Sequence, residues 1–289
     1  MNYIFHILVM INIYIILSLS LNLLVGYTGL LSLAHAAFYG IGAYISTLLI
    51  MKIGLNFFLS LPIAIIFSAV ISLSISYPSL RLKGDYFILA SLAFQIIIFT
   101  ILYNWIDVTR GPYGIPGIPR PHISGLTIDT LPAYFILSTL LAIIIVGIFR
   151  TVYNSPFGRV LKAIREDELS AISLGKNVFW FKVIAFAISS GIAAIAGGLY
   201  AGYITYIDPT SFTLDESIFI LSVVLVGGSG NFRGPIIGAI LMILLPEALR
   251  FLGIPDSIAP NLRQIIYAMT LILLMRYRPQ GLAGEYKFE

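Results

Sequence analysis

Long apolar runs separated by short polar segments dominate this chain. The runs cover residues 4–25, 36–51, 57–77, 86–103, 131–149, 183–203, 218–226, 236–252 and 265–275. Because a membrane-crossing helix needs ~20 apolar residues, the pattern predicts an all-α polytopic integral membrane protein with roughly 8–10 transmembrane or re-entrant helices. Several runs are shorter than that or are interrupted by Gly or Pro, which favours discontinuous helices shielded by protein or water.

The composition agrees with this class. Hydrophobic residues make up 59% of the chain and charged residues 10%, whereas a soluble domain is about a quarter charged. Little chain is left for a soluble domain, so we expect residues 1–289 to form a single transmembrane domain.

The basic residues predict the orientation. Segments 77–85, 150–182, 227–235 and 276–289 carry twelve of the 17 Lys and Arg, and the remaining five lie on the other side. Since cytoplasmic loops are enriched in Lys and Arg, we expect these segments and the C-terminus to face the cytoplasm, in a plasma or inner membrane. The side of the N-terminus depends on whether residues 36–51 cross the membrane fully or re-enter.

Two glycine-rich breaks resemble each other. Residues 25–29 read VGYTG and 226–230 read VGGSG, and each is followed by IGA, at 41–43 and 237–239. We expect the spans to be broken at these glycines: Gly26, Gly29, Gly227, Gly228 and Gly230. An internal repeat is one interpretation, and the general frequency of glycine in membrane helices is the other.

The segment of about residues 105–131 is the one long loop expected outside. It contains RGPYGIPGIPRP, whose prolines and glycines exclude a regular helix. It is either a stiff surface loop or a docking surface at the outer mouth.

The segment of about residues 150–182 is the longest polar stretch. Ser155 can cap a helix that starts at Pro156, and Gly175 can end it. The expected apolar face of this single amphipathic helix consists of Leu161, Ile164, Leu169 and Ile172. Three consecutive acids, residues 166–168, disfavour a helix resting on lipid headgroups, so we expect it to dock on a soluble protein.

Catalytic motifs are missing from the sequence. It has no GxxxxGK[ST], no HExxH, no Cys and no convincing nucleophile triad, so we expect no catalysis, metal site or cofactor in this chain. No acid lies clearly inside an apolar run, which disfavours an ion-coupled carrier. The candidate residues for a translocation path are Asn22, Ser32, His35, Gln95 and Ser189, each of which has helix packing as its alternative role.

Six ordered blocks carry a resemblance. They are SLNLLVGYTGLLSLAHAAFYGIGAY (20–44), GDYFILASLAF (84–94), GPYGIPGIP (111–119), SPFGRVLKAIREDELSAISLGKN (155–177) continuing through 196–203 to DPTSFTLDESI (208–218), VLVGGSGNFRGPIIGA (224–239) and RPQGL (278–282). With these blocks the chain resembles the LivM-type permease subunits of high-affinity branched-chain amino-acid ABC importers.

The resemblance implies a transport machine. Two paralogous permeases would form the path, two cytoplasmic ATPases would bind ATP–Mg, and an external binding protein would deliver leucine, isoleucine or valine. The family's coupling loop corresponds to residues 158–175, and the implied ATPase-coupling residues are Gly158, Arg159, Lys162, Ala163, Arg165, Glu166, Asp167 and Gly175. Import of urea, short amides or another small polar solute by the same machinery is the alternative. A secondary carrier or a membrane enzyme is less favoured, and no nucleic-acid partner is expected.

Overall fold

Helices that can cross a membrane make up about half of the chain. The computed structural model describes residues 2–82, 84–123, 126–250, 265–266, 268–269, 272–273, 276–278 and 280–284. In these residues six helices are long and apolar enough to span a membrane: α1 (Asn2–Thr28), α2 (His35–Ile53), α3 (Phe57–Ser79), α4 (Asp85–Asn104), α6 (Leu131–Asn154) and α9 (Val178–Ile204). The shorter α10 (Leu214–Gly227) and α11 (Arg233–Arg250) join them. The predicted all-α polytopic membrane protein is therefore confirmed, and the apolar run at 265–275 lies largely outside the described residues.

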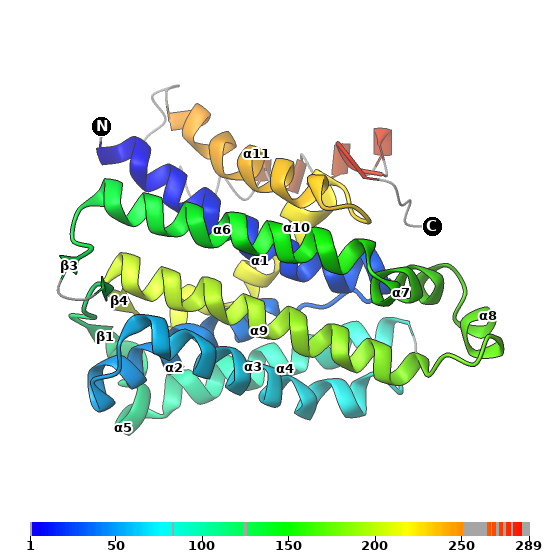
Figure 1. Cartoon of the computed structure of the whole chain (residues 1–289), viewed down its shortest axis with the longest axis horizontal. Helices are drawn as coiled ribbons and strands as arrows, with labels where there is room; N and C mark the ends of the chain where they lie inside the picture. Colours follow the sequence, from blue (N-terminus) through cyan, green and yellow to red (C-terminus); the bar gives the residue numbers. More distant parts are fainter. Residues whose placement is uncertain are drawn as a thin grey trace.

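The long helices run side by side and give the molecule two ends (Figure 1). One end, here called the α7 end, carries α7 (Pro156–Glu166) and α8 (Glu168–Ser173). The other, here called the strand end, carries the N-terminus, α5 (Ile106–Thr109), η1 (Gly111–Tyr113) and four short strands. These strands are β1 (Ile115–Pro116), β2 (His122–Ile123), β3 (Leu126–Thr127) and β4 (Tyr206–Ile207).

The segment rich in Pro and Gly folds without a long helix, as its composition predicts. Its strand β1 pairs antiparallel with β4, so that Ile115 lies opposite Ile207. Strand β2 pairs with β3 in a second two-stranded sheet. The buried Ile115 and Ile118 anchor this surface loop to the helical body.

Helix α9 lies at the centre of the bundle and packs against α1, α2 and α3. Glycine permits the closest contact, because a Cβ atom on Gly197 would overlap the carbonyl oxygen of Tyr39 in α2. Helix α1 is buried over most of its length, whereas α3, α4 and α6 expose large apolar side chains such as Ile66, Ile97 and Ile143. A helix that is apolar on all faces can lie at the centre of a membrane protein or at its periphery, because a peripheral helix turns its outer face to lipid.

Helix α2 begins inside the molecule. After α1 ends at the α7 end, Gly29 turns the chain with a φ of 72°, and His35 then lies 2.7 Å from the hydroxyl of Ser20. Ser20 lies eight residues before the end of α1, so His35 lies ~12 Å inside the molecule, measured along α1 from that end. At the strand end, the Asn56 side chain just after α2 donates to the His122 carbonyl. Residues 36–51 therefore form a crossing that starts inside the protein, and both the N-terminus and the end of α2 lie at the strand end.

Helix α10 also begins inside. The segment before it, which contains η2 (Pro209–Phe212), enters from the strand end, and the Gln95 side chain donates to the Phe212 carbonyl at 2.8 Å. The N–H of Ala36 in α2 donates to the hydroxyl of Ser217 in α10 at 2.9 Å. The first turns of the two helices thus meet in the interior, the discontinuous arrangement that the short apolar runs predict.

The two glycine-rich breaks lie next to each other. The N–H of Gly230 donates to the side-chain oxygen of Asn22 at 3.3 Å, and a Cβ atom on Gly26 would come within 2.5 Å of the Gly230 nitrogen. Helix α10 packs along α11, however, whereas α1 packs on α9 and α6. The breaks share a sequence pattern but not a packing pattern, and the internal repeat stays a prediction.

Candidate functional site

The polar segment after α6 folds into two helices instead of the predicted one. Its start is confirmed, since the Ser155 hydroxyl accepts a hydrogen bond from the Gly158 N–H at 3.2 Å. Helix α7 ends early because Asp167 is extended (φ −155°, ψ 108°) and its carboxylate accepts from the N–H groups of Leu169 and Ser170. Asp167 is thus the N-cap of α8, and this local capture of N–H groups replaces continuation of the first helix. Gly175, with a φ of 73°, follows the end of α8.

The predicted apolar face is correct only for α7. Leu161 and Ile164 are buried against the body of the protein. Leu169 and Ile172 are 75% and 51% exposed, because the turn at Asp167 directs α8 away from the body. Leu174 is also 76% exposed. Residues 166–177, here called the docking tip, are exposed except for Ala171 and present apolar and charged side chains together.

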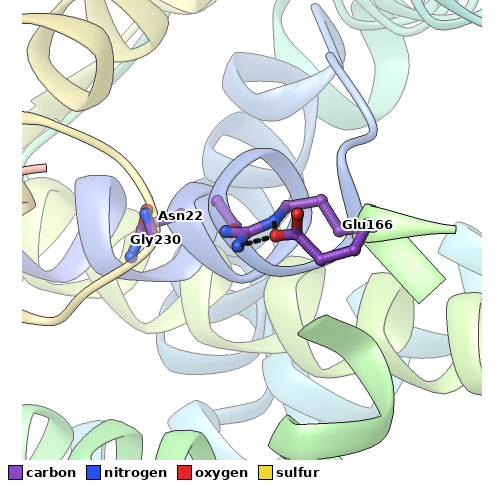
Figure 2. A network of polar contacts seen from close by, with 5 residues as sticks. Asn22, Glu166 and Gly230 are labelled. Carbon is purple, nitrogen blue, oxygen red and sulfur yellow. Dashed lines mark hydrogen bonds and ion pairs between the residues drawn. The ribbon is translucent and has the colours of Figure 1, made fainter. Parts of the chain in front are cut away.

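Helix α7 is attached to the end of α1. The guanidinium of Arg165 donates to the carbonyl oxygen of Gly26 in the last turn of α1 and also pairs with Glu166 (Figure 2). The ammonium of Lys162 lies 5.1 Å from the centre of the Tyr27 ring. Gly158 is buried, and a Cβ atom there would meet the Val152 carbonyl. Three of the predicted coupling residues therefore hold α7 to the body of the protein.

The other predicted coupling residues face outward. Arg159, Ala163, Glu166, Asp167 and Gly175 are exposed. The hydroxyl of Ser170 and the N–H groups of the α8 cap stabilise the charged carboxylate and hold the pKa of Asp167 below its ordinary value.

An ion pair that the sequence does not reveal connects α8 to α9. The ammonium of Lys182, near the start of α9, lies 2.7 Å from the carboxylate of Glu168. In the sequence Lys182 stands between a polar segment and an apolar run. That position indicates a membrane boundary but does not identify Glu168 as its ion-pair partner.

Polar and aromatic contacts continue from α7 to the loop after α10. The rings of Tyr27 and Tyr153 stack with their centres 4.0 Å apart, and the Tyr153 hydroxyl donates to the Leu19 carbonyl. The Asn22 amide donates to the Asn231 carbonyl at 2.8 Å and accepts from Gly230 (Figure 2). Gly26 belongs to the last turn of α1, where its carbonyl accepts from Arg165, and Gly230 donates to Asn22 of the same helix. The helix that anchors α7 is therefore also bonded to the loop after α10.

The residues predicted to line a path make hydrogen bonds inside the bundle. Besides the contacts of Asn22 and His35, Ser189 donates to the Ser20 carbonyl at 2.6 Å, and Gln95 accepts from the Ala37 N–H at 2.7 Å. Ser32 accepts from the Ala34 N–H. None of these five lines the cavity near the strand end described below. Their role in translocation stays a prediction.

A cavity of about 490 Å³ lies in the half of the molecule nearer the strand end. His6, at its outer part, contacts the Tyr203 hydroxyl at the end of α9. Deeper inside, Glu216 in the first turn of α10 accepts a hydrogen bond from the Tyr14 hydroxyl at 2.6 Å. The next residue, Ser217, belongs to the junction where α2 and α10 begin, so the floor of the cavity adjoins that junction.

Sequence reasoning missed Glu216. It found no acid clearly inside an apolar run, yet the structure places this half-buried carboxylate in the interior. The signal was present in the short run 218–226, because a helix that starts inside the protein carries its leading polar residues inside as well.

Comparison with known proteins identifies the family. The family described as "Branched-chain amino acid transport system / permease component" matches residues 3–275. The chain is 35% identical to the Escherichia coli K12 high-affinity branched-chain amino acid transport system permease protein LivM, over 93% of this chain and 67% of that protein. It is 29% identical to a probable LivM permease of Methanocaldococcus jannaschii, over 96% of this chain and 92% of that protein. The E. coli permease LivH is 25% identical, over 96% and 92% of the two chains. No solved structure matches the chain significantly. The chain belongs to this permease family.

Proposed function

We propose that this family member is a transmembrane permease subunit of an ATP-driven importer for branched-chain amino acids, and that it forms the path with a paralogous permease. The names of its LivM and LivH relatives support the substrate and the pairing, since both kinds of permease match nearly the whole chain. The chain itself is a transport subunit and not an enzyme.

In this proposal the α7 end faces the cytoplasm. Tyr77, at the end of α3, packs on Phe179 at the start of α9, which supports placing the α3–α4 turn at this end. The N–H of Leu282 donates to the Val226 carbonyl at the end of α10, so the described part of the C-terminal segment lies there too. Most of the Lys and Arg belong to these segments, whereas Lys52, Arg110 and Arg120 belong to the strand end. The positive-inside rule then favours a cytoplasmic C-terminus in the inner membrane.

The docking tip is the observation that carries the proposal. Leu169, Ile172 and Leu174 expose apolar side chains among charged residues, at the end of the molecule that the basic residues assign to the cytoplasm. An exposed apolar patch ringed by polar groups is typical of a protein interface. We assign it to one of two cytoplasmic ATPases that bind ATP–Mg, so this chain needs no nucleotide site of its own.

The contacts of α7 provide a route for coupling. A force on the docking tip would reach α1 through Arg165 and Gly26, and then the loop after α10 through Asn22 and Gly230. Helix α10 has 14 residues, a length of ~21 Å, and its other end carries Glu216 at the cavity. Movement of α10 as a rigid element would therefore alter the cavity when the ATPases close.

The strand end would face the external binding protein. Pairing of β1 with β4 fixes Ile115 and Pro116 of the loop of residues 105–131 next to the segment that leads into α10. Tyr113 is exposed on that loop and offers an aromatic contact. Aromatic side chains are frequent anchors in protein interfaces.

The experiment is a reconstitution of the chain with its paralogous permease, ATPases and binding protein. We expect ATP-dependent uptake of leucine into liposomes, and we expect Leu174→Asp to release the ATPases during purification. Leu82→Asp, an equivalent change of an exposed leucine in the α3–α4 turn, is the control and should keep them. ATPases that remain bound to the Leu174 variant would contradict the docking assignment. Uptake by this chain alone without ATP would favour a secondary carrier, and uptake of urea in place of leucine would change the substrate.

A further inference from the structure

We propose that the cavity at the strand end is an amino-acid recognition site in which the carboxylate of Glu216 binds the α-ammonium group of the transported solute. The inference rests on the proposed function and adds to it. It gives this permease a selectivity element of its own, besides any selection by the binding protein.

The position of Glu216 suits a cationic ligand. Tyr14 is its one hydrogen-bonding partner among the described residues, and that bond uses a single carboxylate oxygen. An ionised carboxylate has about four acceptor positions, so several remain for the three N–H donors of an ammonium group. The Tyr14 bond also fixes the carboxylate in the wall of the cavity.

The charge of the cavity lining also favours a cationic ligand. Asp215 and Glu247 line the cavity with Glu216, and no Lys or Arg is present in the lining as far as the structure describes it. A half-buried carboxylate without a cationic partner is costly, and a cationic ligand removes that cost.

Aromatic rings add to the attraction. Tyr14, Tyr39 and Tyr200 line the same cavity, and the rings of Tyr39 and Tyr200 lie 5.5 Å apart. The faces of such rings attract ammonium groups.

Much of the remaining lining is apolar. It includes Ile7 and Met10 from α1, Phe219 from α10, and Ile243 and Pro246 from α11. The lining thus combines carboxylates, which attract the ammonium group of an amino acid, with apolar side chains, which match its hydrocarbon side chain. Urea and short amides have neither a cationic group nor a branched hydrocarbon chain, so they do not match. The volume of about 490 Å³ lies within the usual range of small-molecule sites, ~300–1,000 Å³.

The absence of cysteine from the sequence allows a direct test. Thr210→Cys places one thiol of this chain in the lining, and its modification by a cationic methanethiosulfonate reagent is followed by mass spectrometry in the assembled complex in nanodiscs. Leucine should slow the modification, whereas 4-methylpentanoate, which has the same skeleton without the amine, should not. In a Glu216→Gln background the leucine concentration for half-protection should rise about tenfold or more, the loss expected for a charged hydrogen bond.

The controls separate the site from the fold. Gln retains an acceptor for the Tyr14 hydroxyl, and Asp85→Asn removes an equivalent charge from an exposed position at the α7 end. The Asp85 background should keep normal protection. Equal protection by the two ligands, protection that survives Glu216→Gln, or no protection by leucine would overturn the inference. If the Gln variant does not assemble, the comparison of leucine with 4-methylpentanoate on the Thr210→Cys complex decides alone.

The proposed function is judged separately by leucine uptake. A complex that imports leucine without ligand protection at residue 210 would refute only the ammonium site. A complex that imports no amino acid would refute the proposed function itself.

Discussion

Replacing Arg165 by Gln should uncouple ATP hydrolysis from transport. The guanidinium is almost fully buried, with 8% of the side chain exposed, and it donates to a carbonyl in the last turn of α1. A charged hydrogen bond of this kind contributes about 1.5–3 kcal/mol, and its cation also lies favourably at a helix C-terminus. The pair with Glu166 adds little, because the Glu166 carboxylate is 63% exposed and well screened.

The loss of about 2–3 kcal/mol corresponds to a shift of roughly 30- to 150-fold in the equilibrium between attached and detached α7. The exposed apolar residues of the docking tip, Leu169, Ile172 and Leu174, lie beyond Asp167 and keep their exposure, so the ATPases should still bind and hydrolyse ATP. We expect the amount of leucine imported per ATP hydrolysed in proteoliposomes to fall several-fold. Arg165→Lys keeps the charge but cannot bond Gly26 and Glu166 in the same geometry. It should give an intermediate amount of leucine imported per ATP hydrolysed.

Arg81→Gln is the matched control. Arg81 lies at the α7 end and is exposed, with the Tyr77 side chain as its contact, and it is outside the α7–α8 segment. The reasoning fails if the Arg165 variant transports as much leucine per ATP as the unmodified complex. It also fails if the Arg81 variant shows the same loss, because the effect would then follow charge and not attachment.

Three further changes test the local arguments. Gly29→Val forces a β-branched residue to a φ of 72° and should reduce folded yield, whereas Gly147→Val, in open space on α6, should not, as measured by size-exclusion chromatography. Asn22→Ala removes acceptors and donors for the Gly230 loop and should lower stability by about 1–3 kcal/mol in thermal unfolding; the exposed Asn104→Ala should change it little. Folding lowers the pKa of Asp167, so its carboxylate caps α8 at any pH above the ordinary value of 3.8, and the cap is lost as the pH falls through the folded pKa. Amide exchange at the start of α8, corrected for intrinsic rates, should therefore not change with pH near neutrality and should increase in acid. Asp167→Asn should remove this acid-induced increase.

Local rules account for the features that the sequence predicted correctly. Ser155 before Pro156 marks the start of α7, and Leu161 and Ile164 mark its buried face, because each depends on neighbouring residues. The same rules misplace Leu169. An Asp at the end of a short helix can continue it on its surface or cap a new helix, and the periodic pattern is compatible with both.

Tertiary contacts explain the features that the sequence could not predict. The bond from Arg165 to Gly26 joins residues 139 positions apart, and no spacing or motif encodes it. In the sequence Glu216 stands just before an apolar run, as a residue at a membrane boundary does, whereas the structure places the start of α10 inside the molecule beside α2. The helices followed from hydrophobicity, whereas the polar contacts depend on how those helices pack.

Under the proposed function, the position of α10 joins the coupling segment and the interior acid in one mechanism. A helix that starts at a boundary would meet only lipid or solvent at its first turn, and its motion would change no cavity. Because α10 starts in the interior, its first turn places Glu216 in the cavity, while its last turn adjoins the Gly230 loop held by Asn22. The glycines beyond that turn give the loop the backbone freedom to shift, with φ values of 101° at Gly228 and 94° at Gly230. In the proposed function, work that an ATPase delivers at the α7 end would therefore alter an acidic cavity ~21 Å away if α10 moves as one piece.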